Sequence, residues 1–172
     1  MPVNPMQQGR MLARYKAWAG KVIFEAAAQL PEEEVTRPRK SVFKSIAHML
    51  NHIYVIDRVF QAHLEGRPHG YGARNTPDHP PLAELQRAQQ EMDAWYVALS
   101  DRLTPATAEE KVRFDYIGGG EGVMTRSEML LHVVNHGSYH RGFVADFFYQ
   151  IPVQPPATDL TVYLRDAPPR LD

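Results

Sequence analysis

Cysteine is absent from this chain. None of its 172 residues is Cys, which excludes disulfides, thiolate metal ligands and a cysteine nucleophile. This composition is compatible with a reducing compartment. The N-terminal residues also contain no apolar stretch of the kind found in signal peptides. We therefore expect a cytoplasmic protein.

An excess of charge of one sign and long apolar runs are absent as well. The chain has 19 basic and 20 acidic residues, for a formal net charge of −1. The segment RPRK at 37–40 is its one basic cluster, whereas neutralising a phosphate backbone takes a dense basic surface. No apolar run approaches the roughly 20 residues that a membrane-spanning helix needs. We therefore expect a small-molecule substrate, and neither nucleic acid nor a membrane as a partner.

Four long segments have the apolar periodicity of amphipathic helices. They are separated by segments rich in Pro and Gly, such as GRPHGYGARNTPDHPP at 66–81, which we expect to be loops. The predicted helices are residues 5–30, 41–65, 82–103 and 125–150. This pattern predicts an all-α fold, a four-helix bundle, as one domain over residues 1–172. The long connections are compatible with a topology other than simple up-and-down.

Shorter features surround the last predicted helix. In VRFDYIGGGEGVMT, alternating apolar residues precede three glycines, which predicts a short strand or hairpin. TRSE then reads as a capping box, in which Thr125 caps the helix and Glu128 reaches back. We expect residues 31–41 to be a loop or a broken turn, and the tail PPATDLTVYLRD to add a short strand or a helical turn.

Three histidines at a spacing of four lie within HVVNHGSYHRG. A four-residue step on an α-helix returns to nearly the same face, so His132 with His136, or His136 with His140, can share a metal ion. His132 and His140 are separated by about 12 Å along the axis, so all three cannot bind one ion. On a helical wheel His140 and His136 lie roughly 55° and 95° from the apolar direction, and His132 roughly 135°. We therefore predict His136 and His140 as the ligand pair, with His132 facing solvent or a loop.

A third ligand has to come from another helix. HMLNHIYVIDR in the second predicted helix offers His48 and His52, and the same wheel places His52 nearer to the apolar face. A set formed by His52, His136 and His140 leaves a coordination position open, as in catalytic rather than structural zinc sites. The alternative is that histidines at this spacing lie on a polar face by coincidence.

Two other metal chemistries do not fit these residues. A di-iron or di-manganese bundle uses Glu-x-x-His pairs, and none occurs here. A zincin protease needs the glutamate of H-E-x-x-H, whereas Val-Val-Asn and Gly-Ser-Tyr separate the histidines here.

The same residues carry a resemblance to a known family. SVFKSIAHMLNHIYVIDRVF, followed far downstream by HVVNHGSYHRG, resembles the DinB family of DinB/YfiT-like proteins, and the similarity extends over nearly the whole chain. The resemblance implies a four-helix bundle that holds a divalent metal through one histidine of the second helix and an H-x-x-x-H pair of the last. On this sequence these are His52, His136 and His140. The family often has Gln after HRG, where this chain has Phe143, so a polar contact is missing there.

The resemblance also implies a function. It suggests a metal-dependent enzyme, with zinc or nickel as the ion, that uses a low-molecular-weight thiol as an S-transferase, or as a related hydrolase or isomerase. It further implies a homodimer and a link to a stress response. The alternatives are a non-catalytic bundle that binds a metal or a small ligand in a stress response, and an interaction bundle without a metal.

Six further residues lie in or beside the motifs. Tyr139 and Arg141 flank the ligand pair, and each either orients a substrate anion or packs beside the site. Asn51 and Asn135 each precede a predicted ligand, and for both we expect a position on the helix surface. Asp57 and Arg58 are candidates for pairing with another helix, without a catalytic role.

Overall fold

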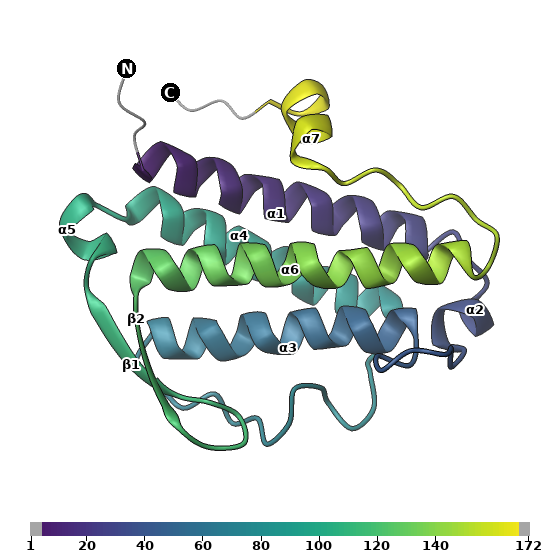
Figure 1. Ribbon diagram of the computed structural model, residues 1–172, viewed down its shortest axis with the longest axis horizontal. Coiled ribbons are helices and arrows are strands. Elements are labelled where there is room, and N and C mark those ends of the chain that lie inside the picture. Colours follow the sequence, from purple (N-terminus) through teal and green to yellow (C-terminus); the bar gives the residue numbers. More distant parts are fainter. Residues whose placement is uncertain (1–4, 169–172) are drawn as a thin grey trace.

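The computed structural model describes residues 5–168, and four long helices form its body (Figure 1). These are α1 (Pro5–Ala27), α3 (Ile46–Leu64), α4 (Leu82–Arg102) and α6 (Arg126–Tyr149). Helix α1 packs on α4 and α6, and α3 also packs on α4 and α6, so the four helices close a ring. The predicted all-α four-helix bundle is confirmed.

The direction of the helices departs from a simple up-and-down bundle. Helices α1 and α6 run one way, and α3 and α4 run the opposite way (Figure 1). Because α3 and α4 are consecutive and parallel, the chain between them must return along the length of the bundle. The segment of residues 65–81 makes that return along the side of α3 (Figure 1).

A two-stranded hairpin precedes α6, as predicted. Its strands are β1 (Lys111–Asp115) and β2 (Glu121–Thr125), paired antiparallel with Phe114 opposite Gly122. Three glycines with positive φ, at 118–120, form the turn, a backbone region that glycine enters without steric cost. The hairpin lies beside one end of α3 (Figure 1).

Three short helices complete the fold. Residues 31–41, expected as a loop or broken turn, contain α2 (Glu32–Thr36). Helix α5 (Pro105–Ala108), which the sequence analysis did not predict, follows α4, and α7 (Leu160–Asp166) is the expected helical turn of the tail. Helix α3 begins at Ile46 rather than near residue 41, because the Ser45 hydroxyl accepts a hydrogen bond from the backbone N–H of His48 and caps the helix there.

The start of α6 follows the predicted capping box. The Thr125 hydroxyl accepts from the Glu128 N–H at 3.2 Å, and the Glu128 carboxylate accepts from the Thr125 N–H at 2.7 Å. These two bonds satisfy N–H groups that a helix start otherwise leaves open. They therefore fix where α6, the helix of the three histidines, begins.

Apolar stripes of the long helices meet in the interior, with side chains such as Ile23, Met49, Tyr96 and Phe147 almost fully buried. An ion-pair cluster is buried among them, in which Lys16 of α1 meets Asp57 of α3 and Asp93 of α4. The expected pairing of Asp57 with another helix is confirmed.

None of the helices in residues 5–168 combines the length and the apolar character that crossing a membrane requires.

Candidate metal centre

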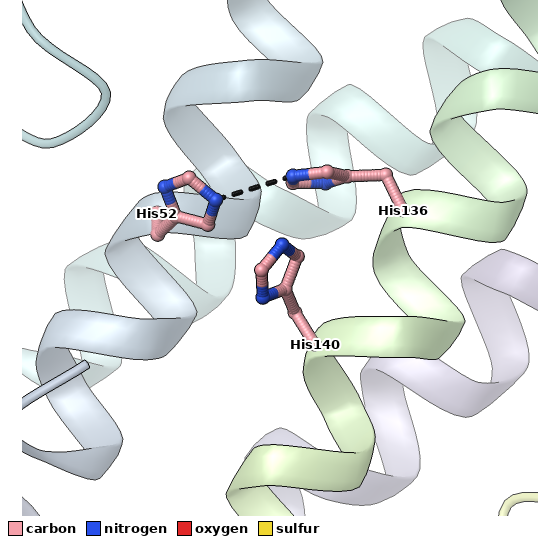
Figure 2. A group of neighbouring side chains, drawn as sticks. All are labelled: His52, His136 and His140. Carbon is pink, nitrogen blue, oxygen red and sulfur yellow. Dashed lines mark hydrogen bonds between the residues drawn. The ribbon is translucent and has the colours of Figure 1, made fainter. Parts of the chain in front are cut away.

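Three histidines from two adjacent helices point toward one another (Figure 2). His52 comes from α3, and His136 and His140 come from successive turns of α6. One ring nitrogen of each lies within 4.8 Å of the others. The residues His52 and His140 are each 6% exposed. The structure thus brings together the three residues predicted from the sequence as metal ligands.

A hydrogen bond fixes the tautomer of His52. Its Nδ1 lies 2.9 Å from the backbone carbonyl oxygen of Arg74. Because a carbonyl oxygen can only accept, Nδ1 must carry the proton, which leaves Nε2 with the free lone pair. A partner of this kind on the non-coordinating nitrogen is the usual support of a metal-binding histidine.

The separation of the ring nitrogens suits a metal ion. Nε2 of His52 and Nε2 of His136 are 3.2 Å apart (Figure 2). Two ligands of a tetrahedral zinc ion, each at about 2.05 Å, are about 3.3 Å apart. The residues present therefore fit a divalent ion held by imidazole nitrogens.

Burial keeps these imidazoles neutral. Desolvation, with a smaller effect of the neighbouring histidines, lowers the pKa of His136 to about 2. Desolvation and the nearby His52 lower the pKa of His140 to about 4. Burial also lowers the pKa of His52, against the opposing effect of the Arg74 carbonyl. A neutral imidazole is the form that binds a metal, so the cluster is in its ligating state at neutral pH.

A cavity of about 460 Å³ opens beside the three rings, a size typical of small-molecule sites. Helices α3 and α6 form its floor, the 65–81 segment and the hairpin border it, and the Phe43 ring contacts His52 and His140. The side chains that line it are mostly apolar or aromatic, including Phe43, Ile56, Val59, Phe60, Phe114 and Ile117.

Asn51 connects the bundle to the 65–81 segment. Its side-chain oxygen accepts from the Thr76 N–H at 3.0 Å, from the Thr76 hydroxyl at 3.1 Å and from the Asn75 amide at 3.3 Å. The expectation that Asn51 lies on the helix surface is therefore wrong, since it is 1% exposed. Asn135 is exposed, as expected. Asn51 thus holds the segment that supplies the Arg74 carbonyl to His52.

His132 is half-buried and faces the cavity that the hairpin borders. Its ring packs against that of Phe60, with centroids 4.3 Å apart and planes tilted by 35°, and it lines the cavity with His136. It stands outside the group of three whose nitrogens converge. His48 likewise lines the cavity without joining that group.

The residues that flank the ligand pair differ in burial. Arg141 is 5% exposed and donates to the Tyr15 hydroxyl at 3.1 Å and to the Ser138 hydroxyl at 3.0 Å. It lies outside the cavity lining, which supports packing rather than substrate contact. Tyr139 is 63% exposed and sets its ring edge against His140. Phe143, at the position of the missing polar residue, packs on Phe43.

Several elements of the site were not predicted. The Arg74 carbonyl belongs to the backbone, so no side-chain pattern marks it. Phe43, Phe60 and Phe114 reach the cavity from three separate segments of the chain, and only their apolar character was visible in the sequence. The one available signal for Asn51 was a polar residue beside a predicted ligand.

The fold and the site together define a class of protein: a helical bundle with three clustered histidines contributed by two of its helices. The chain belongs to the DinB family, whose model matches residues 4–171. The resemblance noted in the sequence is thereby confirmed.

One curated protein and one crystal structure are similar to this chain. Over 164 residues the chain is 30% identical to Protein DinB of Bacillus subtilis strain 168, with 89% of this chain and 91% of the relative covered. The crystal structure of a DinB-like protein from Bacillus cereus ATCC 10987 matches with a TM-score of 0.64 at 16% identity. That match covers 84% of this chain and 91% of the other, and it supports the fold.

Proposed function

We propose that His52, His136 and His140 bind one divalent metal ion, zinc or nickel, and that the protein uses it in a thiol-dependent transfer reaction or a related hydrolysis or isomerisation. The observation that carries this proposal is the convergence of three neutral imidazoles at one end of a cavity of about 460 Å³. Three protein ligands leave a coordination position for a substrate.

The chemistry follows from the donor set and the composition. When bound, such an ion lowers the pKa of a thiol or water at its open position. The chain contains no cysteine, so the thiol would come from a low-molecular-weight cofactor. The protein's own residues supply binding, orientation and exclusion of water.

Each part of the site has a role in this proposal. The Arg74 carbonyl orients His52 through its Nδ1. The four-residue spacing of His136 and His140 places their rings on the same side of α6. Phe43 packs on His52 and His140 and shields them. The apolar lining keeps the dielectric low, which strengthens electrostatic interactions with the reacting group.

Metal analysis of the purified protein tests the proposal. We expect one zinc or nickel ion per chain in the wild type, and a loss of bound metal in His140→Ala. His132→Ala is the matched control, because His132 is on the same helix and lines the same cavity, and it should keep the metal. A wild type that binds neither ion, or equal metal content in both variants, would contradict the site.

Activity is a separate question. Zinc-loaded protein should transfer a low-molecular-weight thiol to a soluble electrophile, and His140→Ala should not. If the metal binds as proposed but no thiol reacts above the uncatalysed rate across a panel of electrophiles, the enzyme proposal fails. The non-catalytic metal-binding bundle then stands in its place.

The cellular setting also belongs to the proposal. A cytoplasmic homodimer with a role in a stress response is supported by the family membership and, for the compartment, by the lack of cysteine. Light scattering on the eluate of a gel-filtration column tests the dimer, which should have twice the 19.6 kDa mass of one chain.

A further inference from the structure

The cavity continues from the three histidines along the groove between α3 and α6. His52, Ile56, Val59, Phe60 and His63 follow one another on the cavity side of α3. From His52 to His63 the helix rises about 16 Å. A ligand with its reacting end at the histidines therefore has room to extend an arm along this groove.

Aromatic rings close the far end of the groove. Phe114, from the hairpin, lies with its ring centroid 5.8 Å from that of Phe60 and 5.1 Å from that of His63. The His132 ring packs against Phe60 from the α6 side. The far wall is therefore built of flat, largely buried ring surfaces.

A glycine holds Phe114 in this position. Gly122 lies opposite Phe114 in the hairpin, and a Cβ at that position would overlap the Phe114 ring. The bare backbone of Gly122 thus gives the ring room on the strand side. Gly122 does not line the cavity. Substituting it therefore moves the Phe114 ring without changing any other residue of the groove.

The groove also has few charges. Arg74 and Asp115 are the charged residues among those that line it. Burial lowers the pKa of His63, which favours its neutral form. No cation in the described lining lies at the Phe114 end, where Asp115 is the neighbour in sequence, so an anionic arm would be buried there without a partner.

We propose that this groove binds an uncharged aryl or alkyl arm of the substrate, and that Phe114 determines the length of arm it accepts. The chemistry at the reacting end of that substrate rests on the function proposed above. The arm itself is bound by burial of apolar surface, which requires no metal.

Calorimetry measures the length of the groove directly. The ligands are ω-phenylalkanols, from phenylmethanol to 5-phenylpentan-1-ol, and the protein is metal-free. We expect affinity to rise up to about fourfold for each added methylene, until the ring reaches Phe114, and then to level off. In Phe114→Ala the rise should continue to longer chains. Val112→Ala, on the same strand but outside the cavity lining, should behave as the wild type.

Two additions keep the test decisive. Gly122→Ala should displace the Phe114 ring and shift the chain length at which affinity levels off, even if Phe114→Ala fails to fold. An ω-hydroxy carboxylate of matched length should bind at least tenfold more weakly than the phenyl compound. Affinities independent of chain length in the wild type, or equal binding of the carboxylate, would overturn the proposal.

The same series made as ω-phenylalkanethiols separates this proposal from the metal-dependent function. If zinc-loaded protein binds the thiols no more tightly than the alcohols while the length dependence persists, the groove stands and the metal-dependent function fails. If the thiols bind tightly but their affinity is unaffected by chain length and by Phe114→Ala, the function stands and the groove is overturned.

Discussion

His52 and Arg74 are joined by a hydrogen bond of 2.9 Å from the imidazole Nδ1 to the backbone carbonyl. This bond directs the lone pair of Nε2 toward His136, whose Nε2 is 3.2 Å away. The geometry of the candidate centre therefore depends on a segment that contributes no ligand of its own. That segment is held in turn by Asn51, the residue immediately before His52.

Replacing Asn51 with alanine should weaken metal binding while leaving all three histidines in place. The change removes three hydrogen bonds to Asn75 and Thr76, so the Arg74 carbonyl loses its fixed position. Loss of such support typically lowers metal affinity about 10- to 100-fold. Competition with a chromophoric chelator measures the affinity for zinc.

Asn135→Ala is the matched control, since Asn135 also precedes a predicted ligand but is exposed. Its zinc affinity should equal that of the wild type. If the Asn51 variant folds with wild-type helicity and also retains wild-type affinity, the 65–81 segment has no part in the site.

The metal-free protein should lose stability as the pH falls from about 6.5 toward 4. Burial lowers the pKa of His136 to about 2 and of His140 to about 4 in the folded state. The unfolded chain, with ordinary histidine pKa values near 6.5, therefore binds more protons in this interval, and protons favour unfolding. Urea denaturation of chelator-treated protein at a series of pH values measures the trend.

Substituting both histidines with leucine should flatten that pH dependence over the same interval, whatever the change in absolute stability. Substituting the exposed His79 with leucine should leave the slope unchanged. A slope in the double variant as steep as in the wild type would show that the acid sensitivity comes from other groups.

The helices and the ligand pair were predictable because both depend on short-range periodicity. Apolar residues at helical spacing define the four long helices, and TRSE marks the start of α6. His136 and His140 lie one turn apart on one helix, so their proximity follows from helix geometry. The choice of His52 over His48 used the same geometry on the second helix.

The rest of the site depends on contacts between distant segments. His132 was expected to face solvent or a loop, and its contact with Phe60 of α3 was not foreseen, because the wheel describes one helix alone. Asn51 was expected on the surface, because the parallel course of α3 and α4, which brings residues 65–81 over it, cannot be inferred from local patterns. The Arg74 carbonyl has no side-chain signature.

Replacing Thr125 with alanine should destabilise the protein by about 1 kcal/mol. The change removes the hydroxyl that accepts from the Glu128 N–H at the start of α6. The histidines lie two to four turns further along the helix, so metal stoichiometry should not change. Thr161→Ala, at an exposed position in α7, serves as the control in urea denaturation. Equal stability of the two variants would contradict a role for the capping box.

The most severe loss of stability should come from the buried ion cluster rather than from the histidines. Lys16 Nζ lies 2.6 Å from Asp57 and 2.5 Å from Asp93, with all three residues at most 4% exposed. Burial lowers the pKa of Lys16, but the two carboxylates outweigh it and raise the pKa above its ordinary value. The ammonium group is therefore charged at neutral pH, and both carboxylates depend on it.

Lys16→Met should accordingly destabilise the fold by about 3–5 kcal/mol, because it leaves two buried carboxyl groups without their cation. Arg14→Met is the matched control, because Arg14 joins α1 to α4, two of the same three helices. Arg14 binds Asp101 through two hydrogen bonds of 3.0 Å at the surface, and an exposed pair of this kind contributes about 1 kcal/mol or less.

Adding Asp57→Asn and Asp93→Asn to Lys16→Met should restore part of the stability, since the remaining groups are uncharged and Gln89, which now donates to both carboxylates, can still pair with them. Urea denaturation of the three proteins decides the matter. If the single Lys16 variant is no less stable than the Arg14 variant, the cluster does not hold α1, α3 and α4 together. If the triple variant is less stable than Lys16→Met alone, the loss does not arise from the uncompensated carboxylates.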